Sequence, residues 1–254
     1  MRTIVRRELV ARQLEEQIAA RFPVGQRLRV LDVGLGHGTQ ALRLARAGHR
    51  ITGLESHAPL IKAVRTALAA EPEGIRERFK LIEGDSRETG VHFLPGSFDV
   101  VLCHGVLMYT EQPDPLLAGL ARVLAPGGLL SLLVRNADAL AMRPGLAGDW
   151  ETALASFGAL TYATRAGRTA RADRLDAVTA TLSGIGAPLQ AWFGVRVLTD
   201  QVADNAHPGS VRELELMLAA EDRAGRTDPY RSVAALLHLC GVRGAPAAEA
   251  ATEA

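Results

Sequence analysis

Three glycines at strict two-residue spacing, with an acidic residue just before them, have the most specific chemistry in this sequence. Gly34, Gly36 and Gly38 follow Asp32 in the stretch LRVLDVGLGHGTQALRLA, which is typical of a buried strand, a tight turn and a helix start. Glycines at such a turn let the backbone approach a nucleotide-like ligand. The carboxylate of Asp32 would repel a pyrophosphate but attract an ammonium group. The spacing therefore indicates a nucleoside ligand that carries an ammonium group.

The same spacing argues against a nicotinamide cofactor. A dinucleotide-binding loop, G-x-G-x-x-G, would place its third glycine where Thr39 stands, whereas here it is Gly38. The pattern D-x-G-x-G-x-G resembles the first motif of class I S-adenosylmethionine (SAM) methyltransferases. That resemblance implies SAM as the methyl donor and S-adenosyl-L-homocysteine as the product. The plainer alternative is a glycine-rich turn that binds no ligand.

Further polar residues are expected at the ends of the next two strands. Glu55 ends an apolar strand at 51–56, and Asp85 ends another at 79–85. Ligands of open α/β sheets bind beyond the carboxyl ends of the strands. Glu55 could accept hydrogen bonds from both ribose hydroxyls and Asp85 from an adenine amino group, with Ser56 and Ser86 beside them. Each acid alone could equally be a solvated strand end.

The fourth expected strand, 98–105, supplies the catalytic candidates. His104 lies at its carboxyl end, where it could contact the cofactor, position the acceptor or remove a proton. Tyr109 follows where an aromatic ring could cover the cofactor. Both residues could instead serve only in packing.

The chain also resembles a narrower family, the methyltransferases that esterify the carboxymethoxy group on a tRNA wobble uridine. The matching stretches are RVLDVGLGHGTQ, CHGVLMYTEQPDP, LAPGGLLSLLVRNADALAM, LAGDWETA, GVRVLTD and DPY. This resemblance implies that an arginine of the N-terminal helix, Arg7 or its neighbour Arg6, holds the cofactor carboxylate. It also implies a basic run that binds the acceptor, here Arg165, Arg168 and Arg171.

Methyl transfer from a sulfonium needs positioning and exclusion of water more than a strong base. The sequence contains no nucleophile elbow and no metal-ligand spacing, so no metal is expected. This favours an acidic acceptor held by arginines. The candidates for substrate binding are Arg135, Asn136, Arg165, Arg168 and Arg196.

We therefore expect a SAM-dependent O-methyltransferase that acts on an acidic acceptor, a carboxylate or hydroxyl, on a small molecule or metabolite. The tRNA wobble-uridine enzyme is the first alternative, with tRNA as its partner. A non-catalytic SAM-binding module is the second. The oligomeric state stays open.

The elements that must position these residues alternate between strands and helices. This alternation predicts an α/β fold: a doubly wound, Rossmann-like, seven-stranded sheet, which is the class I methyltransferase fold. Residues 1–244 are expected to form one domain, with a lid insertion at about 137–170 between strands 5 and 6. The tail, 245–254, is expected to be disordered.

Composition sets the remaining limits. The 254 residues carry a net charge of +1, which argues against non-specific nucleic-acid binding by the whole surface. No run of 18 apolar residues occurs, and the N-terminus lacks the continuous apolar core of a secretory signal. A cytoplasmic protein without membrane contact is expected.

Overall fold

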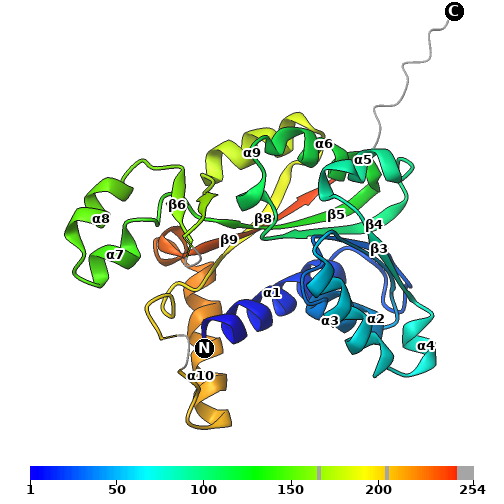
Figure 1. The fold of residues 1–254 in the computed structure, drawn as a ribbon, viewed down its shortest axis with the longest axis horizontal. Helices are drawn as coiled ribbons and strands as arrows, with labels where there is room; N and C mark the ends of the chain where they lie inside the picture. The colour runs from blue at the N-terminus through cyan, green and yellow to red at the C-terminus, as the bar shows by residue number, and fades with distance from the viewer. Residues whose placement is uncertain (165–166, 204–205, 245–254) are drawn as a thin grey trace, which may run out of the picture.

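The computed structural model describes residues 1–164, 167–203 and 206–244, and seven of its strands form one sheet (Figure 1). The strand order is β3-β2-β1-β4-β5-β9-β8. The first five are parallel, and β9 runs antiparallel to both of its neighbours. The seven strands are β1 (Arg29–Val33), β2 (Arg50–Glu55), β3 (Phe79–Glu83), β4 (Phe98–His104), β5 (Leu124–Arg135), β8 (Leu189–Val195) and β9 (Leu236–Val242). The predicted α/β sheet is confirmed.

Helices cover both faces of this sheet, as Figure 1 shows. They are α1 (Arg2–Ala19), α2 (Thr39–Arg46), α3 (Ala58–Ala69), α4 (Glu73–Arg76), α5 (Thr89–His92), α6 (Pro113–Val123), α7 (Met142–Leu146), α8 (Trp150–Ser156), α9 (Leu175–Gly184) and α10 (Val211–Arg226). Three short 3-10 turns lie between them: η1 (Ser86–Glu88), η2 (Leu107–Tyr109) and η3 (Tyr230–Val233). No helix within 1–164, 167–203 or 206–244 is long and apolar enough to cross a membrane.

The core has two layers because successive residues of a strand point to opposite faces of the sheet. Leu31 and Val101 pack in one layer with apolar residues of α6 and α9. Val30 and Val100 pack in the other layer with α1, α2 and α3. The parallel strands are buried on both faces and are therefore nearly continuous apolar runs, which made them predictable from the sequence. They bring their carboxyl ends to one edge.

The predicted lid segment consists of α7, α8 and a small hairpin formed by β6 (Thr161–Ala163) and β7 (Thr169–Arg171). In Figure 1 it projects beyond the sheet, next to the end of β5. The Tyr162 hydroxyl donates to Met108 Sδ at 3.6 Å and so ties the hairpin to η2. The hairpin was not predicted, because these short strands lack an alternating apolar pattern. The predicted tail, 245–254, lies outside the described residues.

Candidate functional site

A cavity of about 1030 Å³ opens at the carboxyl ends of the parallel strands. Its wall includes most of the residues expected to bind the cofactor, namely Gly34, Gly36, Glu55, Ser56, Asp85, Ser86, His104 and Tyr109. These residues come from the ends of β1 to β4 and the loops that follow them. The fold therefore brings together side chains that are up to 75 positions apart in the sequence, as between Gly34 and Tyr109.

The glycine loop is shaped by backbone angles and by space. Gly34 has φ of +69°, and a Cβ there would lie 2.2 Å from Val106 Cγ2. Gly36 has φ of +58° and lines the cavity with its backbone. Gly38, at φ of +70°, is not part of the cavity wall but precedes α2. Glycine is the residue that adopts this left-handed region without strain. The loop is thus a cradle that side chains would fill.

Glu55 is buried and held rigidly at the end of β2. Its Oε2 accepts from the Gly36 N–H at 2.8 Å, and its Oε1 accepts from the amides of Ser56 and His57 at 3.0 and 2.9 Å. A carboxylate offers about four acceptor positions. One position on Oε2 thus remains for a ribose hydroxyl, whereas the sequence suggested that both hydroxyls would be accepted.

Asp32 lies behind the cavity wall and is only 5% exposed. Burial, with the nearby charge of Glu55, raises the pKa of the Asp32 carboxyl to about 7. The residue was expected next to the cofactor ammonium. A buried carboxyl beneath the glycine loop would be stabilised in its charged form by a cation placed above it.

His104 lines the cavity, and its Nε2 lies 2.8 Å from Ser131 Oγ. Burial, with the positive charge of Arg6, lowers the pKa of His104 to about 3. Its ring is therefore neutral near pH 7 and is a poor base. Proton removal, one of the roles suggested for it, does not fit this environment; contact with a bound ligand does.

A second cavity, of about 1140 Å³, lies between the strand ends and the lid segment. Five arginines line it: Arg6, Arg135, Arg143, Arg168 and Arg196. The acidic residues in its wall are Asp149 and Glu151. Tyr109 and Arg168 line both cavities. The Arg168 guanidinium lies 5.6 Å from the Tyr109 ring centre, so this pair forms the border between them.

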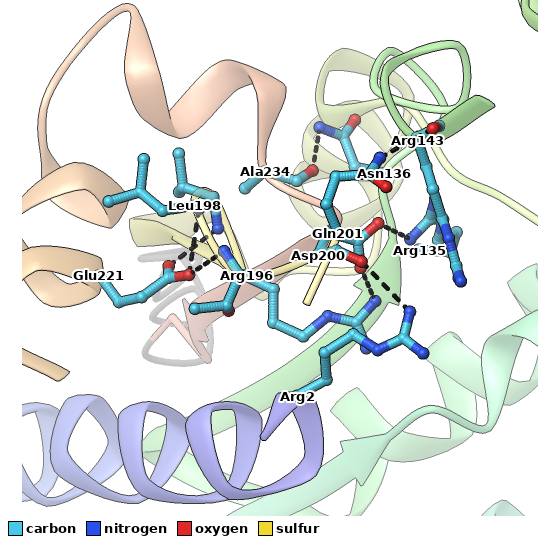
Figure 2. A network of polar contacts seen from close by, with 12 residues as sticks. Arg2, Arg135, Asn136, Arg143, Arg196, Leu198, Asp200, Gln201, Glu221 and Ala234 are labelled. Atoms are coloured by element: carbon cyan, nitrogen blue, oxygen red, sulfur yellow. Dashed lines mark hydrogen bonds and ion pairs between the residues drawn. The ribbon is translucent and has the colours of Figure 1, made fainter. Parts of the chain in front are cut away.

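Two of these arginines share one carboxylate (Figure 2). Asp200 forms an ion pair with Arg196, and its Oδ2 lies 3.8 Å from Arg135 Nη1. Among the described residues, the buried Nε atoms of Arg135 and Arg196 have no hydrogen-bond partner. Burial lowers the pKa of both guanidiniums, and Asp200 acts in the opposite direction; the charges of Arg143 and Arg2 further lower the pKa of Arg135, and those of Arg135 and Arg2 lower that of Arg196. The pair retains excess positive charge that an anion would balance.

The loop after Arg196 holds this residue in a strained conformation. Arg196 has φ of +62° and is the one non-glycine residue with positive φ in the described part of the chain. Glu221, fully buried on α10, accepts from the amides of Val197, Leu198 and Thr199 at 2.9, 3.0 and 2.7 Å. Left-handed φ at such a residue costs on the order of 1–3 kcal/mol and often marks functional sites.

Two predicted site residues are placed differently by the structure, and a third is not described. Arg7 is exposed and lies 3.4 Å from Glu8 Oε1, and it lines neither cavity; Arg6, the other arginine considered, lines the second cavity. Asn136 is 1% exposed and bonds only to backbone: its Nδ2 donates to two carbonyls and its Oδ1 accepts from Asp138 N–H. A substrate role for Asn136 is therefore wrong. Arg165 lies outside the described residues.

Several residues of the second cavity were missed by sequence reasoning. Arg143 and Tyr162 come from the lid segment, where no periodic pattern indicated which side chains point inward. Glu221 looked like one more charged position of an amphipathic helix.

Comparisons with known proteins agree with this geometry. Residues 31–132 match a family model described as a methyltransferase domain. The chain is 29% identical to a tRNA 5-carboxymethoxyuridine methyltransferase of Escherichia coli (strain K12), over 92% of this chain and 87% of the relative. It is 35% identical over 114 residues to a ubiquinone biosynthesis O-methyltransferase of Paracidovorax citrulli, covering 44% and 46%. A solved SAM-dependent methyltransferase of Methanosarcina mazei shares the fold, with a TM-score of 0.61 at 15% identity, over 91% of this chain and 98% of that one.

Proposed function

We propose, from the premise that this chain is a class I SAM-dependent methyltransferase, that it methylates a carboxylate of its acceptor and so forms a methyl ester. The observation that carries this proposal is the buried pair Arg135 and Arg196, which shares the single carboxylate of Asp200. A second carboxylate, from the acceptor, would balance the positive charge that this pair retains.

The first cavity fits SAM, which supplies an electrophilic methyl group when bound. In this proposal the glycine loop leaves room for the cofactor. Oε2 of Glu55 accepts a hydrogen bond from a ribose hydroxyl, and Asp85 accepts one from the adenine amino group. The cofactor ammonium would lie near Asp32 and His104, which come from the neighbouring strands β1 and β4. Arg6, which lines the second cavity, would bind the cofactor carboxylate.

A carboxylate acceptor needs no general base, because it is already the nucleophile. This agrees with a neutral His104 whose pKa lies at about 3. The chain's contribution is then to hold the acceptor oxygen in line with the methyl group and to exclude water. Tyr109 and Arg168 stand where the two cavities meet, so they would orient the reacting groups. The segment 137–170 would act as the lid.

The carboxylate is carried either by a small metabolite or by a modified nucleotide of tRNA. The tRNA candidate is favoured by the 29% identity that extends over 92% of the chain. The hairpin arginines Arg168 and Arg171 would meet its phosphates. The arginine-lined second cavity fits either carrier, since both present the same acidic group.

The test uses the purified full chain, SAM labelled in its methyl group, and two acceptor pools: bulk tRNA and a metabolite extract. We expect label that is released as methanol by mild alkali, which distinguishes a methyl ester from an ether or an N-methyl group. Label in the RNA fraction identifies the tRNA enzyme, and label in the metabolite fraction identifies the small-molecule enzyme. Label that resists alkali in both fractions would refute ester formation.

A further inference from the structure

A chain of four polar side chains crosses the apolar layer between the sheet and α1. His104 Nε2 lies 2.8 Å from Ser131 Oγ, and that hydroxyl lies 2.8 Å from His238 Nε2. His238 Nδ1 lies 2.8 Å from Gln13 Oε1. The members come from β4, β5, β9 and α1 in turn. Gln13, Ser131 and His238 are each 0% exposed, so the chain begins at the cofactor cavity and ends inside the core.

A buried series of polar side chains lowers the stability of the fold unless its hydrogen bonds are made, because buried polar groups without partners destabilise the fold. Leu130 and Leu132 flank Ser131 and are fully buried, and an apolar residue at position 131 would continue this run. Cys240 Sγ also lies 3.7 Å from His238 Nε2. Packing alone therefore does not account for a histidine, a serine and a glutamine in series at this place.

The donor and the acceptor of each hydrogen bond follow from Gln13, the last residue of the series. Gln13 presents its carbonyl oxygen Oε1, which can only accept, to His238 Nδ1, so His238 Nδ1 donates, and the buried Nε2 of Gln13 has no hydrogen-bond partner among the described residues. Burial, with repulsion from His104, keeps the pKa of His238 well below its usual value, so its ring is neutral and its Nε2 accepts. The Ser131 hydroxyl then donates to His238 and accepts from His104 Nε2.

From this geometry we infer that Gln13, His238 and Ser131 are positioning residues that hold His104 in its Nε2–H tautomer, with the lone pair of Nδ1 directed at the cofactor cavity. A lone pair there is a hydrogen-bond acceptor for a cationic N–H donor, and the methionine ammonium of SAM is such a donor. The positive charge of Arg6, which acts on His104, disfavours a second N–H on this ring. The ligand part of the inference rests on the proposed function; the tautomer part does not.

The tautomer can be read directly from the ¹⁵N shifts of the two ring nitrogens in full-length protein labelled at histidine, with His104→Asn used for assignment. We expect Nε2–H for His104 in the unchanged chain. Gln13→Met removes the terminal acceptor with little change of volume, and Ser131→Ala removes the hydroxyl that links His104 to His238. Both should give His104 a mixture of tautomers. An Nδ1–H form in the unchanged chain, or an unaltered tautomer in both variants, would overturn the inference.

Binding of SAM gives the second readout. We expect the dissociation constant for SAM to rise in Gln13→Met and Ser131→Ala by the inverse of the fraction of His104 that keeps Nε2–H, about twofold for an equal mixture of tautomers. Ser131→Thr keeps the hydroxyl and should restore both the tautomer and the affinity. Gln17→Met makes the same chemical change one turn further along α1, outside this series of hydrogen bonds, and should leave the tautomer and the SAM affinity unchanged.

The two parts of the inference fail in different ways. A shifted tautomer with unchanged SAM affinity would overturn the assignment of the ammonium to His104 Nδ1. Absence of SAM binding by the unchanged chain would instead refute the proposed function, whatever the tautomer is.

Discussion

Replacing Asp32 with asparagine should make the ligand-free protein more stable at neutral and alkaline pH. Asp32 is 5% exposed, and burial with the charge of Glu55 raises the pKa of its carboxyl from 3.8 to about 7. Ionising this group in the folded protein is therefore unfavourable. Asparagine keeps the shape and one acceptor oxygen but carries no charge, so Asp32→Asn removes that cost.

The magnitude follows from linkage. A carboxyl whose pKa is raised on folding stabilises the fold fully below its unfolded pKa, and this stability is lost as pH rises through the folded pKa. A shift from 3.8 to about 7 is worth about 4 kcal/mol once both pKa values are exceeded. At pH 5 the loss is only about 2 kcal/mol, because the folded form is still protonated. The advantage of Asp32→Asn should thus grow by about 2 kcal/mol between pH 5 and pH 8.

Urea unfolding of both proteins at the two pH values measures this difference in free energy. Asp99→Asn is the matched control, because Asp99 has a lowered pKa: burial opposes the shift, but hydrogen bonds from Arg29 outweigh it. The effect of Asp99→Asn should therefore be the same at pH 5 and pH 8, because both values lie above the unfolded pKa and the lowered folded pKa of Asp99. With SAM present, Asp32→Asn should gain less from the ligand than the unchanged protein does. An equal effect of Asp32→Asn at both pH values would refute the assignment of the cost to its charge.

Four further predictions concern the two cavities. Arg135→Met should raise the KM for the acceptor by roughly tenfold to a hundredfold in steady-state assays and leave SAM affinity unchanged, since one charged contact is lost. Gly34→Ala should abolish SAM binding in calorimetry, because its Cβ would meet Val106 at 2.2 Å, and adding Val106→Ala should restore part of it. A kcat profile from pH 5 to 8 should show no inflection from His104, whose pKa is about 3; a step that disappears in His104→Asn would contradict this. Glu221→Gln should raise the acceptor KM, because it weakens the loop that holds Arg196, and an unchanged KM would show that this loop is not needed.

The parallel strands and the glycine loop could be predicted because their causes are local. Each strand is a short apolar run, and the loop has glycines where the backbone must take positive φ. The expected set of strand-end residues, including Glu55 and Asp85, then followed from the rule that parallel strands end at one edge. The choice between Arg6 and Arg7 did not follow, since one residue turns a helical side chain by about 100°.

The second cavity could not be predicted in the same way. Arg135, Arg168 and Arg196 were expected to bind substrate, but the cavity that they share with Arg143 was not expected, because an arginine in sequence looks the same whether it is solvated or buried. The substrate role expected for Asn136 failed for a related reason, because its side-chain amide donates hydrogen bonds to backbone carbonyls nearly a hundred positions later. Contacts between distant segments decide both cases.

By itself, the sequence determined the fold and the strand edge where a ligand is expected, because periodicity, turn residues and acid spacing are short-range properties. Only the tertiary structure decided which charges are buried together. It placed Arg135 and Arg196 around one carboxylate, and it joined Gln13 to His104 through two strands. The energies of such groups depend on burial and on neighbours across the fold, which no local pattern records.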